Sequence, residues 1–196
     1  MTIVTSDNPR LIRCESNLEA KAAYVLLARP DVVDVSEQPE AVAYLDEDGC
    51  QRHHTFDFLV TRVDGTRIAV AVKPAKVARR RNLHAMLGRV AAQMSRAFAD
   101  AVLLLTDEDL PAHLVQNAML VHAARRGRCA EHDGRVAEFV RSLNGRITVG
   151  TLVEALGLAG DGFRAVVRAI GDGLLDLVGG GCIDYDTLVS PVGGIG

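Results

Sequence analysis

The feature that most constrains the fold of this sequence is a predicted β-hairpin. It covers residues 53–76 and reads HHTFDFLVTRVDGTRIAVAVKPAK. Two runs rich in β-branched and aromatic residues flank Asp64-Gly65, which is a strong turn signal. An apolar hairpin of this kind indicates a sheet with buried faces. Its single acid before the turn, Asp57, and the lysine at its end, Lys73, need an explanation.

The length of the turn decides whether these two charges meet. A two-residue turn would pair Asp57 with Val72 and leave Lys73 on the opposite face. A three-residue loop, with Gly65 in the left-handed conformation, pairs Asp57 with Ala71 and puts Lys73 on the same face. The second register also makes the other face wholly apolar, so we expect it to form. That apolar face would carry Phe56, Phe58, Val60, Ile68, Val70 and Val72.

An acid and a lysine on one face have two interpretations. In a phosphodiesterase site, the carboxylate holds a hard divalent cation and the lysine steadies the attacking water or the scissile phosphate. In the structural interpretation they form an ion pair with no further role, as is common on protein surfaces. The motif is short, and both interpretations stay open at this point.

The elements around the hairpin predict a mixed α/β domain. A helix is expected over residues 17–29 with Ser16 as its N-cap, followed within residues 32–39 and 41–46 by two strands or by one strand and an extended arm. After the hairpin come a helix over residues 82–98 and a buried strand at 101–106. With one strand before the hairpin, the order is αβββαβ. Thr106 is placed to cap a further helix that begins near residues 110–111.

The last third of the chain has a different pattern. From about residue 132, three short amphipathic segments separated by glycine-containing turns precede a terminal hairpin. Three helices and a hairpin predict a small winged-helix domain. We therefore expect a first domain over residues 1–110, a connecting helix over 111–131 and the winged helix over 132–196.

Composition excludes several classes of protein. The chain has 196 residues, of which 48% are hydrophobic, and a net charge of −3. It contains no apolar window long enough to span a membrane. Its four cysteines show no zinc-ligand spacing, so we expect reduced thiols in a cytoplasmic protein.

Charge is distributed unevenly. Residues 65–99 contain no acid and eight basic residues, a local charge of +8, which is typical of contact with a DNA backbone; a solvated basic helix face is the alternative. Residues 141–196 instead carry four arginines and six acids, a net −2. A recognition helix over residues 163–170, with Arg164 and Arg168, and a protein-docking role for this domain are both open.

Five short segments together resemble a known family. They are SNLE at 16–19, EQP at 37–39, FDF around Asp57, AVKP at 71–74 and LLLTDEDL at 103–110. In order and spacing they resemble the N-terminal domain of the TnsA-like endonucleases, the subunits of heteromeric transposases that cut the 5′ ends of a transposon. That family is similar in fold to restriction endonucleases, the PD-(D/E)xK nucleases.

The resemblance implies a hydrolase site and partners. Glu19, Asp57 and Lys73 would be catalytic, with Glu19 and Asp57 holding Mg²⁺ or Mn²⁺ and Glu15 as a substitute for Glu19. Glu19 also fits a capping box with Ser16. Double-stranded DNA at transposon ends, a partner transposase and an ATP-dependent regulator subunit are the implied partners. The basic residues expected to contact that DNA are Lys76, Arg79, Arg80, Arg81 and Arg89.

Ala71 departs from the family pattern. Related nucleases have Glu or Gln at this position, and either would offer the metal an oxygen that alanine lacks. The chain is then an endonuclease that works with fewer ligands, a silenced nuclease fold that serves as a DNA-binding or architectural subunit, or a sequence with an inactivating substitution. A transcription regulator that uses only the winged helix is a further alternative.

Overall fold

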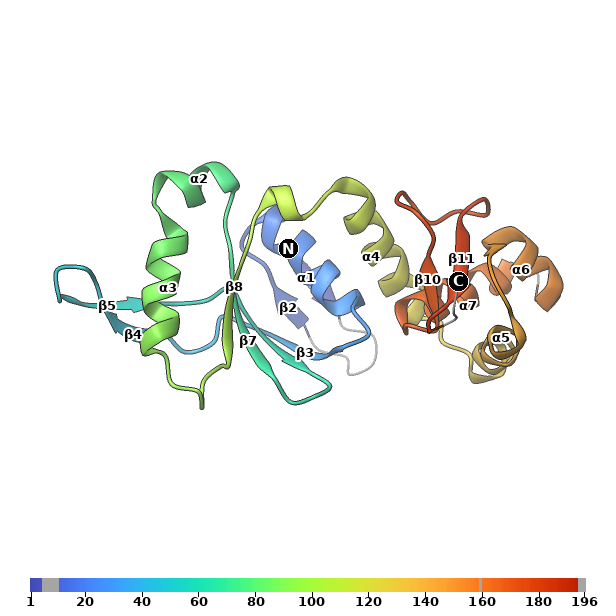
Figure 1. Ribbon diagram of the computed structural model, residues 1–196, viewed down its shortest axis with the longest axis horizontal. Helices are drawn as coiled ribbons and strands as arrows, with labels where there is room; N and C mark the ends of the chain where they lie inside the picture. Colours follow the sequence, from blue (N-terminus) through green and yellow to red (C-terminus); the bar gives the residue numbers. More distant parts are fainter. Residues whose placement is uncertain (5–10, 159, 194–196) are drawn as a thin grey trace. The chain divides into compact units, whose positions relative to one another are not determined.

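The computed structural model describes residues 1–4, 11–158 and 160–193, which form two compact units of mixed α and β structure (Figure 1). The first unit includes residues 1–4, 11–27 and Asp31–Pro111. The second includes Ala28–Pro30 and residues 112–193. The predicted domains also include residues 5–10, 159 and 194–196. These lie outside the described residues.

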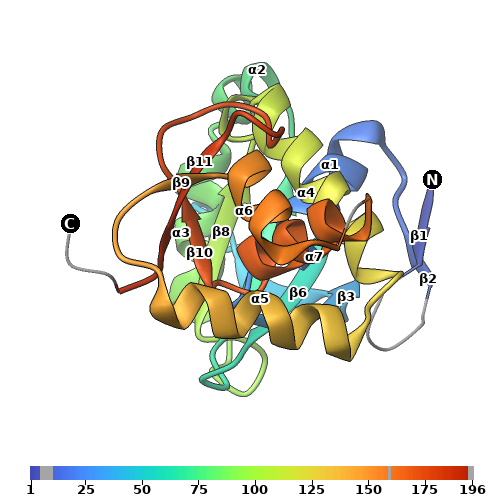
Figure 2. The same ribbon diagram turned by 90° about the vertical axis from the view of Figure 1, so that its right-hand side faces the viewer.

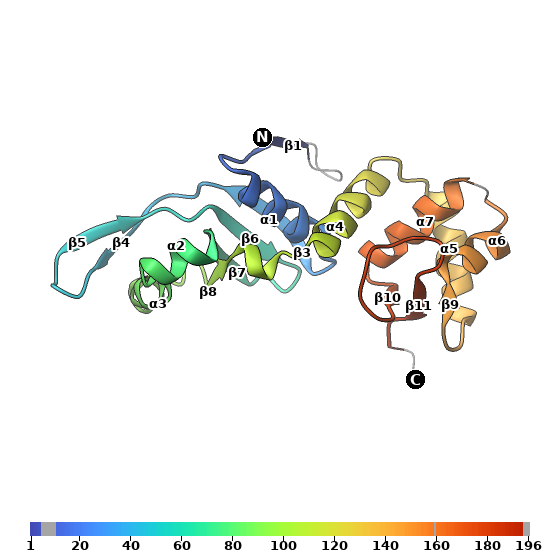
Figure 3. The same cartoon turned by 90° about the horizontal axis from the view of Figure 1, so that it is seen from above.

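A four-stranded sheet forms the centre of the first unit. Its strands are β3 (Val32–Glu37), β6 (Phe58–Arg62), β7 (Arg67–Val72) and β8 (Ala101–Leu105), in that order across the sheet. Only β7 and β8 are parallel; the other neighbours are antiparallel. Figure 3 shows α1 and α3 on opposite sides of this sheet. The remaining elements of the unit are β1 (Thr2–Val4), β2 (Leu11–Arg13), α1 (Asn17–Ala28), β4 (Val42–Leu45), β5 (Gln51–His54), α2 (Ala75–Arg80), α3 (Leu83–Gln93) and the 3₁₀ turn η1 (Asp107–Asp109).

The predicted register of the hairpin is confirmed. Phe58 lies opposite Val70, and the same offset places Asp57 opposite Ala71. The loop closes through a hydrogen bond from the Arg62 amide to the Thr66 carbonyl at 2.9 Å, and Gly65 has a φ of +82°. Glycine suits this left-handed position because it has no Cβ.

Both faces of the hairpin are buried. Phe58, Val60 and Val70 are buried on one face, as predicted. On the other face, Leu59, Ala69 and Ala71 form a core with Leu87 and Val90 of α3. Phe56 belongs to this second core, so its predicted place on the first face is wrong. The strand β6 begins only at Phe58, and the alternation therefore does not extend back to Phe56.

Several predicted elements differ from those observed. The run that was expected to form one strand is interrupted at residues 55–57, and β5 pairs with β4 as a separate hairpin (Figure 3). The helix expected over 82–98 ends at Gln93. The strand β8 is an edge strand and is only partly buried, whereas a buried strand was expected. Thr106 caps η1 rather than a long helix, and α4 starts at Ala112.

The second unit contains the predicted helices and terminal hairpin (Figure 2). The helix α7 packs against α4, α5 and α6, and Ala165, Val166 and Val167 on it are completely buried. Arg168 is only 2% exposed, which argues against its use as a DNA contact in a recognition helix, one of the two roles left open for this domain. The elements are α4 (Ala112–Arg125), α5 (Ala130–Ser142), β9 (Ile147–Thr148), α6 (Val149–Leu156), α7 (Gly160–Gly171), β10 (Leu175–Leu177) and β11 (Leu188–Pro191), with the strands in the order β10-β11-β9.

Two general expectations bear on the whole chain. Among the described residues, no helix has both the length and the apolar character needed to cross a membrane. All four cysteines are free thiols.

Candidate active site

Asp57 and Lys73 form the centre of the candidate site. Asp57 directly precedes β6 and Lys73 directly follows β7, so the confirmed register brings their side chains together. The Lys73 ammonium donates to both carboxylate oxygens of Asp57, at 3.1 Å each. The Val72 amide donates to Oδ2 of Asp57 at 2.7 Å. The carboxylate is 18% exposed and the lysine side chain 39%, so the pair remains open to solvent on one side.

Two further residues adjoin this pair. His54, at the end of β5, is near enough to be influenced by both charges. Burial lowers its pKa, Asp57 opposes that shift and Lys73 adds to it. Its ring contacts Phe56 edge-on, with the centroids 4.6 Å apart. Gln38 donates from its backbone amide to the Asp57 carbonyl at 3.0 Å.

Neither His54 nor Gln38 was among the site residues that we predicted from the sequence. The proximity of His54 to Asp57 depends on the break between β5 and β6, for which the apolar pattern gave no signal.

Glu19, the second predicted acid, is occupied at the start of α1. Its two oxygens accept hydrogen bonds from the Glu15 amide at 2.7 Å and the Ser16 hydroxyl at 2.9 Å. The predicted capping interaction thus forms, although Glu19 reaches the amide of Glu15 rather than that of Ser16. Glu15, the predicted substitute, accepts from the Gln38 side chain at 2.6 Å. Gln38 therefore connects Glu15, not Glu19, with the backbone of Asp57.

Ala71 lies in the apolar layer beneath α3. It is 2% exposed and packs in the core that contains Leu87 and Val90. A longer polar side chain at this position would start from a buried Cβ on the same face as Asp57. Alanine leaves this face with one carboxylate and one ammonium, and no second side-chain oxygen from β7.

The candidate site fits Mg²⁺ only if the ion keeps several of its water ligands. Among the described residues, no group of three or more His, Cys, Asp or Glu side chains is arranged to hold a metal ion. Mg²⁺ often needs only one or two protein carboxylates, because it keeps several of its waters. Asp57 would supply one such carboxylate, and Glu19, with Glu15 as its substitute, stays the predicted second acid. The described residues do not supply a cage built from protein ligands alone.

The predicted DNA-contacting residues fall into two groups. Lys76, Arg80 and Arg81 are exposed on or beside α2 and have no ion pair or hydrogen bond from their side chains within the described ranges. Arg79 pairs with Glu108, and Arg89 pairs with Glu47 at 2.6 Å. These acids lie outside the acid-free segment of residues 65–99, so the basic block is partly neutralised in three dimensions. The positive charges of Lys76, Arg80 and Arg81 are therefore available to bind an external anion.

Comparison with known proteins gives a family match for part of the chain. Residues 29–100 match the family model described as "TnsA-like endonuclease N terminal". This range contains the paired strands β6 and β7 with Asp57 and Lys73, and it ends before Ala112, where the main part of the second unit begins. No curated protein matches the chain. Residues 29–100 are therefore similar to the N-terminal domain of the TnsA-like endonucleases.

Proposed function

We propose that this chain is the DNA endonuclease subunit of a heteromeric transposase and hydrolyses phosphodiester bonds at transposon 5′ ends with Mg²⁺. The observation that carries the proposal is the Asp57–Lys73 pair within the TnsA-like segment. Double-stranded DNA, a partner transposase and an ATP-dependent regulator are the partners that this function requires, and the cytoplasm is where the chain would meet them.

The proposal includes two finer fold assignments. The sheet order β3-β6-β7-β8, with the parallel pair at one edge and helices on both faces, agrees with a restriction-endonuclease-like core. In the second unit, the chain order α5, β9, α6, α7, β10, β11 agrees with a winged helix. Its third helix, α7, is covered by neighbouring helices, which argues against a regulator that reads DNA with this helix alone.

Each residue of the site has a chemical role in this proposal. Asp57, with Glu19 as the predicted second acid, would hold the metal, which supplies Lewis-acid stabilisation of the phosphate when bound. Lys73 would donate to a phosphate oxygen or orient the attacking water. Lys76, Arg80 and Arg81, whose side chains have no partner among the described residues, would contact the DNA backbone next to the site.

A second candidate function is a DNA-binding or architectural subunit with a silent nuclease site. Two observations favour it: Ala71 supplies no oxygen, and both oxygens of Glu19 are already hydrogen-bonded. In this case the family fold and the basic surface would be retained, and cleavage would be lost.

One assay separates the two candidates. Nicking of a duplex that contains a transposon end is measured with Mg²⁺ or Mn²⁺, with and without the partner transposase. The proteins compared are the natural chain, Asp57→Asn, Lys73→Met, Ala71→Gln and Ala71→Glu. The exposed acid Asp48, on the turn between β4 and β5, provides the control Asp48→Asn.

The endonuclease proposal predicts nicking by the natural chain and the control, with loss in Asp57→Asn and Lys73→Met. Nicking only after substitution of Ala71 would support the silent-site candidate. If no protein nicks the DNA but the natural chain still binds it, the endonuclease proposal is wrong.

A further inference from the structure

A groove of about 450 Å³ lies between α4 and α7 in the second unit. Its apolar surface comes from Leu120, Ala123, Phe163 and Val167, and two arginines, Arg126 and Arg164, line it as well. None of these residues belongs to the candidate nuclease site. The groove therefore needs an explanation that the proposed reaction does not provide.

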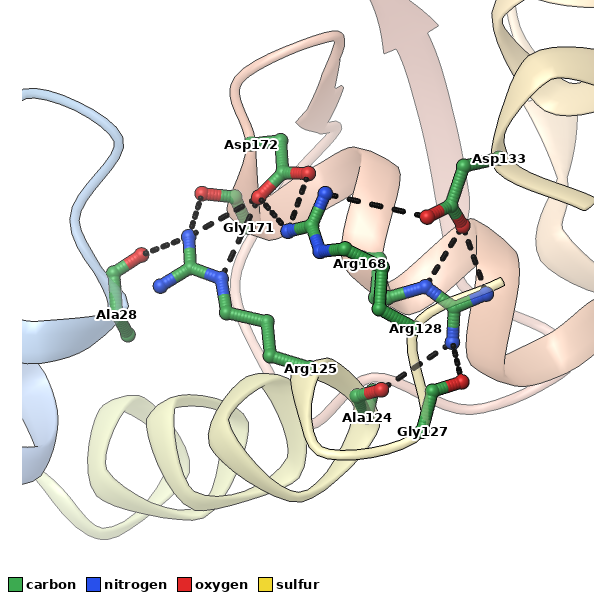
Figure 4. Close-up of polar contacts among 9 residues, drawn as sticks. All are labelled: Ala28, Ala124, Arg125, Gly127, Arg128, Asp133, Arg168, Gly171 and Asp172. Atoms are coloured by element: carbon green, nitrogen blue, oxygen red, sulfur yellow. Dashed lines mark hydrogen bonds and ion pairs between the residues drawn. The ribbon is translucent and has the colours of Figure 1, made fainter. Parts of the chain in front are cut away.

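The groove is held in shape by buried polar contacts (Figure 4). The guanidinium of Arg168 donates to the carbonyls of Ala124 and Gly127 at 3.2 and 3.3 Å, and both of these residues line the groove. The same guanidinium is fixed by Asp133 at 2.7 Å. The loop after α4 is thus bound to α7 before any ligand arrives. A preformed groove lowers the entropy that binding has to overcome.

Phe163 is held as well. Its ring stacks on Tyr185 with the centroids 4.8 Å apart. The groove therefore offers a fixed aromatic surface beside aliphatic side chains. Such surfaces and arginines are both enriched at the centres of protein interfaces.

The groove carries two arginines that have no acidic partner within the described ranges. Arg126 and Arg164 are exposed, and neither has a hydrogen bond or an ion pair from its side chain in the described part of the chain. The nearby arginines differ, because Arg128 and Arg168 bond to carboxylates. Two positive charges thus flank the apolar surface of the groove. A ligand that complements both features carries negative charge next to an apolar side chain.

A peptide fits this description better than DNA. The residues from 112 to 193 include eight arginines, no lysine and nine acids, so the unit as a whole does not attract a polyanion. A DNA backbone also has no apolar group to fill the groove floor. We propose that the groove binds a segment of a partner protein in which an apolar side chain is flanked by Asp or Glu.

The probe for this proposal is a labelled synthetic peptide in which Phe and Leu alternate with Glu. The same peptide with Lys in place of Glu and a labelled DNA duplex serve as comparisons, and all are titrated into the full chain. We expect only the acidic peptide to shift the NMR signals of Leu120, Ala123 and Val167. The double variant Arg126→Glu/Arg164→Glu should weaken its binding about tenfold or more, which corresponds to the loss of two exposed charge contacts and their replacement by repulsion.

Two variants control for other effects. Ala123→Trp fills the groove from an exposed position and should abolish binding, while circular dichroism verifies the fold. Arg146→Glu reverses an exposed charge that does not line the groove and should bind like the natural chain.

The proposal is overturned if the lysine peptide binds as well as the acidic one, or if the double reversal leaves binding unchanged. It is also overturned if the reversal weakens duplex DNA binding while the acidic peptide does not bind at all. Failure here is distinguishable from failure of the proposed nuclease, because Asp57→Asn should keep the peptide affinity and lose nicking.

Discussion

Arg168 provides the sharpest test of how the second unit is stabilised. Its side chain is 2% exposed, pairs with Asp133 at 2.7 Å and donates to two backbone carbonyls. Arg168→Ala leaves Asp133 and both carbonyls without this donor. Removal of one partner from a buried ion pair costs about 3–5 kcal/mol. The Asp133 side chain is 22% exposed, and Arg128 remains 3.9 Å from its Oδ2, so we expect the low end of this range, about 3 kcal/mol.

The matched control is Arg164→Ala on the same helix. Arg164 is exposed and has no side-chain partner among the described residues, so its loss should change the unfolding free energy by less than about 0.5 kcal/mol. Urea unfolding followed by circular dichroism gives the total. Hydrogen exchange of peptides from α7 assigns the loss to the second unit, which is needed because two units can unfold separately.

A second comparison tests the mechanism. Arg168→Met combined with Asp133→Leu removes both charges together, and replacement of a buried pair by apolar residues is often nearly neutral. We therefore expect the double variant to recover most of the stability that Arg168→Ala loses. Equal effects of Arg168→Ala and Arg164→Ala, or a double variant that is no better than the single one, would refute the argument that an unpaired buried charge is the cause.

Two further predictions concern packing and pH. A Cβ on Gly171 would lie 2.3 Å from a methyl group of Val121, so Gly171→Ala should destabilise the chain by about 1–3 kcal/mol. A Cβ on Gly134 of α5 meets nothing within 4 Å, so Gly134→Ala should stabilise the chain by about 0.5–1 kcal/mol. Thermal unfolding measures both changes. Burial lowers the pKa of His54 below 6.5. Below about pH 6.5, His54 therefore binds a proton more readily in the unfolded chain than in the folded chain. The free energy of unfolding is retained above about pH 6.5 and falls below it. His54→Gln should reduce this fall in pH-dependent urea unfolding, and the exposed neighbour His53→Gln should not; equal slopes for both would contradict the assignment.

The central hairpin was predictable because its determinants are local. The apolar alternation, the Asp-Gly turn and the choice of Gly65 for a positive φ all lie within residues 53–76, and together they fix the register that joins Asp57 and Lys73. The N-terminal capping of α1 by Ser16 and Glu19 was predictable for the same reason. In each case the deciding contacts join residues close in sequence.

Features that depend on distant contacts were missed. The break before β6 places Phe56 beneath α3, and no glycine or proline marks it. The break between α2 and α3 falls at Asn82, which adopts a left-handed φ of +47° that its type permits but does not dictate. The charge count over residues 65–99 missed Glu47 and Glu108, because they come from other segments. The sequence left open a DNA contact by Arg168, but tertiary packing buries its side chain.

Ala71, rather than the ion pair, should decide whether the site cleaves DNA. Lys73 is 39% exposed, and a pair this accessible contributes no more than about 1 kcal/mol, so it is a weak barrier to a cation at Asp57. A missing ligand is a larger obstacle, because it lowers metal affinity directly. Ala71→Gln would add an amide oxygen to the site. Because the amide is uncharged, its burial in the apolar layer beneath α3 costs less than the burial of a carboxylate. If the missing ligand limits the reaction, this variant should nick at lower Mg²⁺ concentration with unchanged DNA affinity. If it shifts DNA affinity and leaves the Mg²⁺ dependence unchanged, residue 71 acts on DNA binding and the ligand argument fails.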